Sequence, residues 1–237
     1  MALPKLSNDR PIYEMVVPST KETVKFRPFL VKEQKNLLVA FESQDQKQIL
    51  NSMLVCIESC VPGIDIKKLA TFDVDYMFTQ VRSKSVGETT TVLSACTKCN
   101  EENEVKINLG EIGVDGSEIK TEIIPINDDI SVEMKYPTYE DTLKYTQSEA
   151  SNNAAENLFN SIAICIYAVQ TKDENILLKH ESKEEVETFI NSLTNQQLEK
   201  ITQFVDSIPT LIHEQKYNCK KCNHENTLTM KGLQDFF

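Results

Sequence analysis

CTKCNEEN at residues 96–103 and CKKCNHEN at residues 219–226 are two copies of one motif, and they decide the fold of this chain. Each copy separates two cysteines by two residues and follows them with asparagine, which tolerates the left-handed backbone conformation that reverses a chain. Such a turn points both thiols at one metal ion, so each copy supplies half of a zinc site. Structural zinc takes four ligands in a tetrahedron. We therefore expect one four-cysteine site formed by Cys96, Cys99, Cys219 and Cys222.

Two other uses of these cysteines compete with structural zinc. The thiols could pair as disulfides, or one pair could carry thioredoxin-like redox chemistry. The redox alternative lacks the active-site neighbours and the parallel βαβ pattern that it requires. Residues 90–93, 105–109 and 227–230 flank the motifs with strand-like sequence, which favours two hairpins that each end in a zinc knuckle.

The two halves of the chain are similar beyond the motif. LNSMLVCI at residues 50–57 matches FNSIAICI at residues 159–166, and the same spacing relates Pro28 to Pro137. We expect an α+β fold with an internal duplication, in which each unit runs as β-hairpin, helices and zinc-knuckle hairpin, and the two knuckles join in one zinc-ribbon-like site. The second copy carries an insertion around residues 171–187. Chance similarity in a helix-rich chain is the alternative.

The domain organisation follows from length and from the shared zinc site. With 237 residues and 40% hydrophobic content, the chain can bury a substantial core. We expect an extended arm at residues 1–10 and a single compact body at 11–237, made of two diverged repeats at about 11–115 and 116–237. The sequence contains neither an apolar run of about 20 residues nor a secretory signal, so we expect a soluble intracellular protein with no membrane span.

Several local patterns predict particular elements. Asp73 suits the N-cap of a helix whose buried stripe is Val74, Met77, Phe78 and Val81. Residues 154–169 predict the most apolar helix of the chain. Residues 233–237 form an apolar tip that either folds back on the core or, with the N-terminal arm, contacts a partner.

The remaining three of the seven cysteines are expected in the core. Cys56, Cys60 and Cys165 lie in apolar helical runs, where a free thiol behaves as a small buried hydrophobe. Cys56 and Cys60 share a helix face, but the sequence shows no histidine or acidic residue that would complete a metal site beside them.

The sequence predicts no active site. The chain has three histidines: His180 lies in a polar loop, while His213 and His224 flank the second motif and could contact the metal site. Phosphate-binding glycine motifs and a nucleophile elbow are missing from the sequence. The formal net charge of −11 disfavours nucleic acid as a partner. We therefore expect a non-enzymatic protein that binds other proteins.

One family shares these features. The segment KFRPFLVKE at residues 25–33, followed by the leucines at 37 and 38 and by the paired knuckles, resembles the baseplate hub subunits and hub assembly proteins of T4-like contractile-tailed bacteriophages. The resemblance covers most of the chain. It carries no catalytic residues onto this sequence.

The resemblance implies a structural or assembly protein of the phage tail baseplate hub, acting through contacts with other hub proteins. It would work in the host cytoplasm during assembly, and the resemblance leaves open whether it stays in the virion baseplate. A zinc-ribbon adaptor of transcription or translation is the alternative, which a basic surface would favour. The sequence leaves the oligomeric state, the copy number and the direct partners open.

Overall fold

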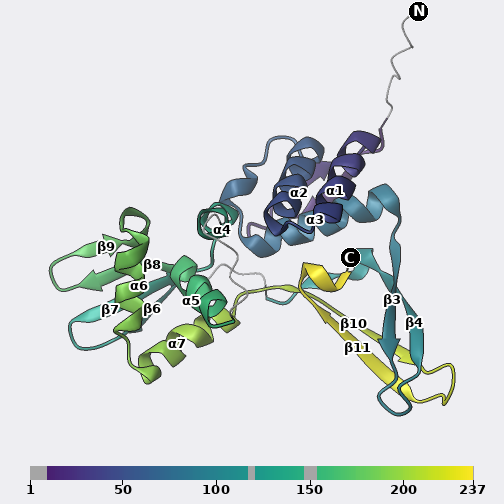
Figure 1. The fold of residues 1–237 in the computed structure, drawn as a ribbon. Coiled ribbons are helices and arrows are strands. Elements are labelled where there is room, and N and C mark those ends of the chain that lie inside the picture. The colour runs from purple at the N-terminus through teal and green to yellow at the C-terminus, as the bar shows by residue number, and fades with distance from the viewer. Residues whose placement is uncertain (1–9, 117–120, 147–153, 237) are drawn as a thin grey trace, which may run out of the picture. The chain divides into compact units, whose positions relative to one another are not determined.

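The computed structural model describes residues 10–116, 121–146 and 154–236 (Figure 1). All of the expected N-terminal arm except Arg10 therefore lies outside the described residues, as does Phe237. The chain divides into two units. Unit 1 comprises the chain up to Ile66, Phe72–Asp115 and the chain from Thr210 onward, and unit 2 comprises Lys67–Thr71 and Gly116–Pro209.

A β-hairpin and three helices form the N-terminal part of unit 1. In order they are β1 (Tyr13–Val16), β2 (Thr23–Phe26), α1 (Val31–Ser43), α2 (Gln46–Cys60), the short 3-10 helix η1 (Ile66–Lys68) and α3 (Thr71–Val86), of which the last two residues of η1 and the first residue of α3 belong to unit 2. Because α3 begins at Thr71, the predicted N-cap role of Asp73 is wrong. Its buried carboxylate instead accepts hydrogen bonds from the backbone N–H (2.8 Å) and the hydroxyl (2.5 Å) of Ser19, which fastens the hairpin turn to α3. The predicted buried stripe is confirmed for Val74, Met77, Phe78 and Val81.

A buried carboxylate fixes the start of α1. Glu33, 4% exposed, accepts the backbone N–H of Leu30 at 2.7 Å and pairs with the guanidinium of Arg27 at 3.1 Å. Burial opposes ionisation of Glu33, but these two groups, together with the ammonium of Lys32 at 3.3 Å, hold its pKa below the usual value. Arg27 also donates to the thiol of Cys60 at 3.6 Å. The predicted burial of Cys56 and Cys60 is confirmed, and the guanidinium of Arg27 links the Glu33 carboxylate to the Cys60 thiol.

The two knuckle hairpins complete unit 1. They are β3 (Thr89–Ala95) with β4 (Glu102–Asn108), and β10 (Leu211–Asn218) with β11 (Glu225–Lys231). The short strand β5 (Gly113–Val114) adds to β10, and the 3-10 helices η2 (Leu109–Glu111) and η4 (Leu233–Phe236) follow β4 and β11. Apolar side chains from both hairpins share one core, formed by Val105, Ile107, Leu109, Ile112, Leu211 and Met230. Leu233 packs against this core, so the beginning of the C-terminal tip folds back.

Unit 2 combines an antiparallel sheet with four helices. The sheet has the order β6 (Thr121–Pro125), β7 (Ile130–Lys135), β8 (Ile166–Thr171) and β9 (Asn175–Leu177). The other elements are α4 (Tyr139–Thr146), α5 (Ala154–Cys165), η3 (Leu178–His180), α6 (Lys183–Asn191) and α7 (Asn195–Asp206). The helix predicted over residues 154–169 therefore ends at Cys165. The following residues form β8 because β7 offers a strand edge, against which Val169 pairs with Val132.

The order of elements is the same in both halves of the chain. A hairpin (β1–β2 or β6–β7), two helices, a further helix (α3 or α7) and a knuckle hairpin follow each other, and the second half inserts β8, β9, η3 and α6. The mixed α and β composition is confirmed, while a structural superposition of the two repeats stays a prediction. The two units do not coincide with the two consecutive halves, because the C-terminal hairpin belongs to unit 1. Whether the units form one compact body also stays a prediction. Within the described ranges, no helix combines the length and the hydropathy needed to cross a membrane.

Candidate metal centre

Both motifs fold into the same turn at the tip of a hairpin. In the first, the backbone N–H of Cys96 donates to the carbonyl of Glu101 and that of Asn100 donates to the carbonyl of Cys96, both at 2.9 Å. In the second, Cys219 donates to His224 and Asn223 donates to Cys219 at the same distances. Asn100 and Asn223 have φ angles of 55° and 54°, which confirms the predicted left-handed asparagines.

The two turns bring the four predicted cysteines together. Their Sγ atoms all lie within 4.8 Å of one another, with Cys96 3.7 Å from Cys222 and Cys99 3.6 Å from Cys219. A zinc–sulfur bond of about 2.3 Å in a regular tetrahedron places the sulfurs about 3.8 Å apart, so these separations suit zinc. They are far longer than the roughly 2.05 Å of a disulfide, and all seven cysteines are free. This geometry weighs against the disulfide alternative.

Two buried asparagines connect one turn to the other. The side-chain oxygen of Asn226 accepts the backbone N–H of Thr97 at 3.0 Å, and that of Asn103 accepts the backbone N–H of Lys220 at 2.8 Å. Each asparagine therefore holds the residue that follows the first cysteine of the opposite motif. Both asparagines are 4% exposed. We call this reciprocal arrangement of Asn103 and Asn226 the asparagine exchange.

The amide nitrogens of the same side chains point at the sulfurs. Asn226 Nδ2 donates to Cys96 Sγ at 3.6 Å and to the carbonyl of His224 at 2.8 Å. Asn103 Nδ2 donates to Cys219 Sγ at 3.8 Å and to the carbonyl of Glu101 at 2.7 Å. Hydrogen bonds from such outer residues orient metal ligands and partly neutralise thiolate charge. This role was not predicted from the sequence, although asparagine occupies the last position of both motif copies.

Alternation along the strands explains why the asparagines face the site. In β4 the residues Asn103, Val105 and Ile107 are buried while their neighbours are exposed, as expected for a strand with one face on the core. In β11, Asn226 and Met230 are buried in the same alternation. Asn103 and Asn226 thus lie on the same buried strand faces as the apolar core, at the ends of the strands nearest the four thiols. Hydrogen bonds from the Tyr217 hydroxyl to Ser94 and Ala95 further join β10 to β3.

The local electrostatics favour thiolate at the first cysteine of each motif. The pKa of Cys219 is lowered to about 6, first because the backbone N–H of Cys222 donates to its sulfur and also because Lys221 does. Burial opposes ionisation of Cys96, but backbone N–H groups and the amide of Asn226 lower its pKa below the usual value. Such thiolates are the form of cysteine that binds metal.

The second cysteine of the first motif, Cys99, has a raised pKa instead. The backbone N–H of Glu101 lowers the pKa of Cys99, but burial and the neighbouring thiols outweigh it and raise that pKa to about 12. Four thiolates cannot share this small volume without a cation to offset their charge, which a divalent metal ion would supply. Nearby, the ammonium groups of Lys220 and Lys221 lie 3.6 Å and 3.4 Å from the carboxylate of Glu101. Glu101 of the first motif therefore partly neutralises the two lysines of the second motif.

The histidines lie outside the cluster of possible ligands. Among the described residues, the group whose donor atoms converge contains Cys96, Cys99, Cys219 and Cys222 alone. His224 contributes through its backbone carbonyl, which accepts the N–H of Cys219, and its side chain is exposed. His213 is buried on β10, near the opposite end of the strand from Cys219, and its Nε2 has no hydrogen-bond partner in the described structure.

These features define a class of protein: an α+β chain whose C-terminal hairpin is joined to its middle by four cysteines able to hold a metal ion. The chain belongs to the family of T4 bacteriophage base plate proteins, whose family model matches residues 10–237. Comparison with curated proteins gives no match, and neither does comparison with solved structures. The family match confirms the phage baseplate resemblance over nearly the whole chain.

Proposed function

We propose that this chain is a non-enzymatic structural or assembly protein of the phage tail baseplate hub, and that it acts through contacts with other hub proteins. The observation that carries the proposal is the match of residues 10–237 to the baseplate family. The hub is proposed because the segment at residues 25–33 resembles hub subunits and hub assembly proteins. The structure gives that segment a role, because its Arg27 and Glu33 form the buried pair that fixes the start of α1.

We further propose that Cys96, Cys99, Cys219 and Cys222 hold one structural zinc ion. The sulfur separations of 3.6 Å and 3.7 Å suit tetrahedral zinc, and four thiolate ligands leave no coordination position for a reacting water molecule. Zinc in such a site would contribute to folding, since the ligands belong to two hairpin turns that are more than one hundred residues apart in sequence. The ion would hold the C-terminal hairpin to β3 and β4.

Elemental analysis of the purified chain tests the metal. We expect one zinc ion per chain, and a content of no metal or of two metals would contradict a single four-cysteine site. Iron in place of zinc would contradict the identity of the ion, because four cysteines also suit iron. Exchange with cadmium or cobalt would give the charge-transfer absorption of metal–thiolate bonds and provide an independent count of the cysteine ligands.

Infection with phage that lack this gene tests the hub role. We expect incomplete baseplates by electron microscopy, and a plasmid copy of the wild-type gene should restore complete tails. A copy that carries Cys219→Ser should restore fewer tails than one that carries Cys165→Ser, because Cys165 lies outside the metal cluster. Normal numbers of infectious tails without the gene would overturn the hub assignment. Antibody labelling of purified tails would decide between a virion subunit and an assembly factor.

A further inference from the structure

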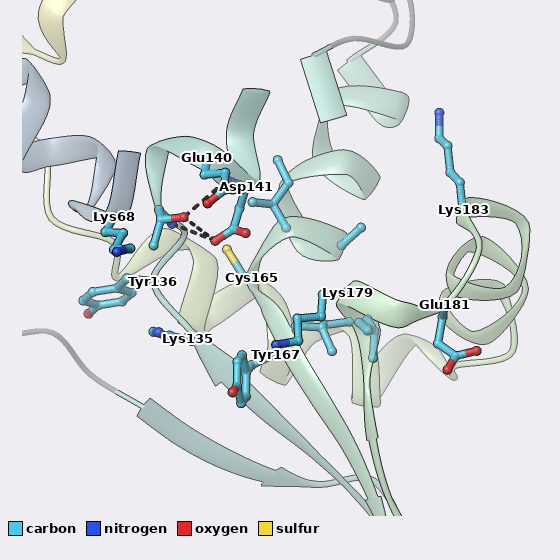
Figure 2. A pocket seen from close by; sticks show the side chains of 15 residues that line it. Lys68, Lys135, Tyr136, Glu140, Asp141, Cys165, Tyr167, Lys179, Glu181 and Lys183 are labelled. Atoms are coloured by element: carbon cyan, nitrogen blue, oxygen red, sulfur yellow. Dashed lines mark hydrogen bonds between the residues drawn. The ribbon is translucent and has the colours of Figure 1, made fainter. Parts of the chain in front are cut away.

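A cavity of about 680 Å³ lies within unit 2, where β7, β8, η3 and the start of α4 meet (Figure 2). Lys68, from the segment Lys67–Thr71, lines part of it. A β-bridge between Ala70 and Thr138 and a hydrogen bond from the backbone N–H of Tyr139 to the carbonyl of Leu69, at 3.0 Å, hold this segment to α4. The cavity is therefore formed by fixed backbone, and its volume is within the range of sites that bind small molecules or short peptide segments.

The cavity collects positive charge in a strongly acidic unit. Unit 2 contains seventeen acidic residues and nine lysines, and four of these lysines line the cavity. They are Lys68, Lys135, Lys179 and Lys183. Of these, Lys183 pairs with Glu187, and Lys68 is engaged in another interaction. Three acidic residues, Glu140, Asp141 and Glu181, also line the cavity. The positive charge that points to an anionic ligand is therefore that of Lys135 and Lys179.

Two of these lysines face an aromatic ring and have no carboxylate partner. The ammonium group of Lys135 lies 5.5 Å from the ring centroid of Tyr167, and in Figure 2 the side chain of Lys179 also reaches toward this ring. Within the described part of the chain, neither lysine forms an ion pair or a side-chain hydrogen bond. Tyr167 is 39% exposed, so the ring and both cations are open to a ligand.

The lining carboxylates, those of Glu140, Asp141 and Glu181, form no ion pair with Lys135 or Lys179 in the described structure. Asp141 is engaged with Thr138, whose backbone N–H and hydroxyl donate to its carboxylate at 3.1 Å and 2.6 Å. Figure 2 shows Glu181 pointing away from Lys135 and Lys179. Apolar side chains, among them Ile164, Ile166 and Leu178, form another part of the wall. The site thus offers two free ammonium groups next to an aliphatic surface.

We propose that this cavity binds an acidic segment of a partner protein, with carboxylates on Lys135 and Lys179 and an apolar side chain against the aliphatic wall. The apolar wall would leave much of the cavity unused by a phosphate ion. A nucleic acid is charged along its whole length, so outside the cavity it would be repelled by a unit with seventeen acidic residues against nine lysines, whereas a short segment can place its few carboxylates on Lys135 and Lys179 alone. The inference takes from the proposed function only that the partner is another protein of the baseplate.

Fluorescence anisotropy tests the proposal on the full-length, zinc-loaded protein. The probe is a fluorescein-labelled hexapeptide in which glutamate and aspartate residues flank one leucine and one phenylalanine. We expect saturable binding that weakens with added salt, and a loss of about tenfold or more in affinity for the double variant Lys135→Glu, Lys179→Glu. A peptide with glutamine and asparagine in place of the acidic residues should bind at least about tenfold more weakly.

The matched control reverses two other lysines of unit 2. Lys172 and Lys200 are exposed and do not line the cavity, so Lys172→Glu, Lys200→Glu makes the same change in net charge and should keep the affinity within about twofold. Circular dichroism and zinc content confirm that all variants fold. Equal losses in both double variants, or no binding by the wild type, would overturn the proposal. So would displacement of the peptide by equimolar inorganic phosphate, or tighter binding of a single-stranded oligonucleotide. Because no hub protein takes part, such a failure leaves the hub assignment untouched.

Discussion

Replacing Asn226 by alanine should weaken the metal centre without touching a ligand. The side chain accepts the backbone N–H and the hydroxyl of Thr97 at 3.0 Å and 2.8 Å, and it donates to the carbonyl of His224 and to Cys96 Sγ. Each hydrogen bond contributes about 1 kcal/mol net, and with 4% exposure of Asn226 water cannot easily replace them. We expect the free energy of unfolding to fall by about 2–4 kcal/mol.

The same substitution should lower zinc affinity by about 10- to 100-fold, the usual effect of removing a residue that orients a metal ligand. Competition with a chromophoric chelator measures the affinity, and denaturant unfolding measures the stability. Asn103→Ala should give a similar loss, because Asn103 makes the equivalent bonds to Lys220 and Cys219. Asn226→Asp tests the donor separately. It keeps an acceptor for Thr97 but places a carboxylate beside the Cys96 sulfur, so its zinc affinity should fall below that of Asn226→Ala.

Asn218→Ala is the matched control, because Asn218 is exposed and directly precedes Cys219. It should change zinc affinity by less than about twofold, consistent with a surface substitution of within 0.5 kcal/mol. The reasoning is refuted if Asn226→Ala and Asn218→Ala have equal zinc affinities. It is also refuted if Asn226→Asp binds zinc as tightly as the wild type, since the hydrogen bond to sulfur would then have no effect on the site.

Two further predictions concern the cysteines and the start of α1. Cys219→Ser should abolish tight zinc binding and lower the melting temperature. Cys165→Ser should keep one zinc per chain and lower the free energy of unfolding by about 1–3 kcal/mol, because it buries a hydroxyl. Loss of zinc in both variants would refute this prediction. Glu33→Gln should cost about 1.5–3 kcal/mol at pH 7, measured by denaturant unfolding. Because the folded-state pKa of Glu33 is lowered, its stabilisation is present above the unfolded-state pKa and is lost as pH falls through the folded value, so the difference between wild type and variant should shrink toward pH 3. A difference that does not change with pH would contradict this assignment.

The four clustered cysteines could be predicted from sequence because the pattern that brings each pair together is local. Two cysteines separated by two residues and followed by asparagine specify one turn, and φ angles of 55° and 54° at Asn100 and Asn223 are what that turn requires. Two such pairs in one chain can together supply the four ligands of one tetrahedral site. The buried stripe of α3 and the burial of Cys56 and Cys60 were predictable for a similar reason, since helical periodicity alone sorts the side chains.

Features that depend on a neighbour distant in sequence were not predictable. Residues 166–171 follow an apolar helix and form β8 because β7 lies beside them. Aspartate is a common N-cap residue, yet the carboxylate of Asp73 accepts a hydrogen bond from the Ser19 hydroxyl instead. Local sequence offers both conformations at similar free energy, and a tertiary contact decides between them.

By itself, then, the sequence determined which four thiols form the cluster, the α+β class and the hairpins that carry the cysteines, because spacing and periodicity act within a few residues. Only the tertiary structure decided that Asn103 and Asn226 exchange hydrogen bonds across the cluster and that the C-terminal hairpin shares a core with β4. It also placed Lys135 and Lys179 around one cavity. The residues in these contacts are separated by tens to more than one hundred positions in the chain. A pattern within a few residues of sequence does not predict that they come together.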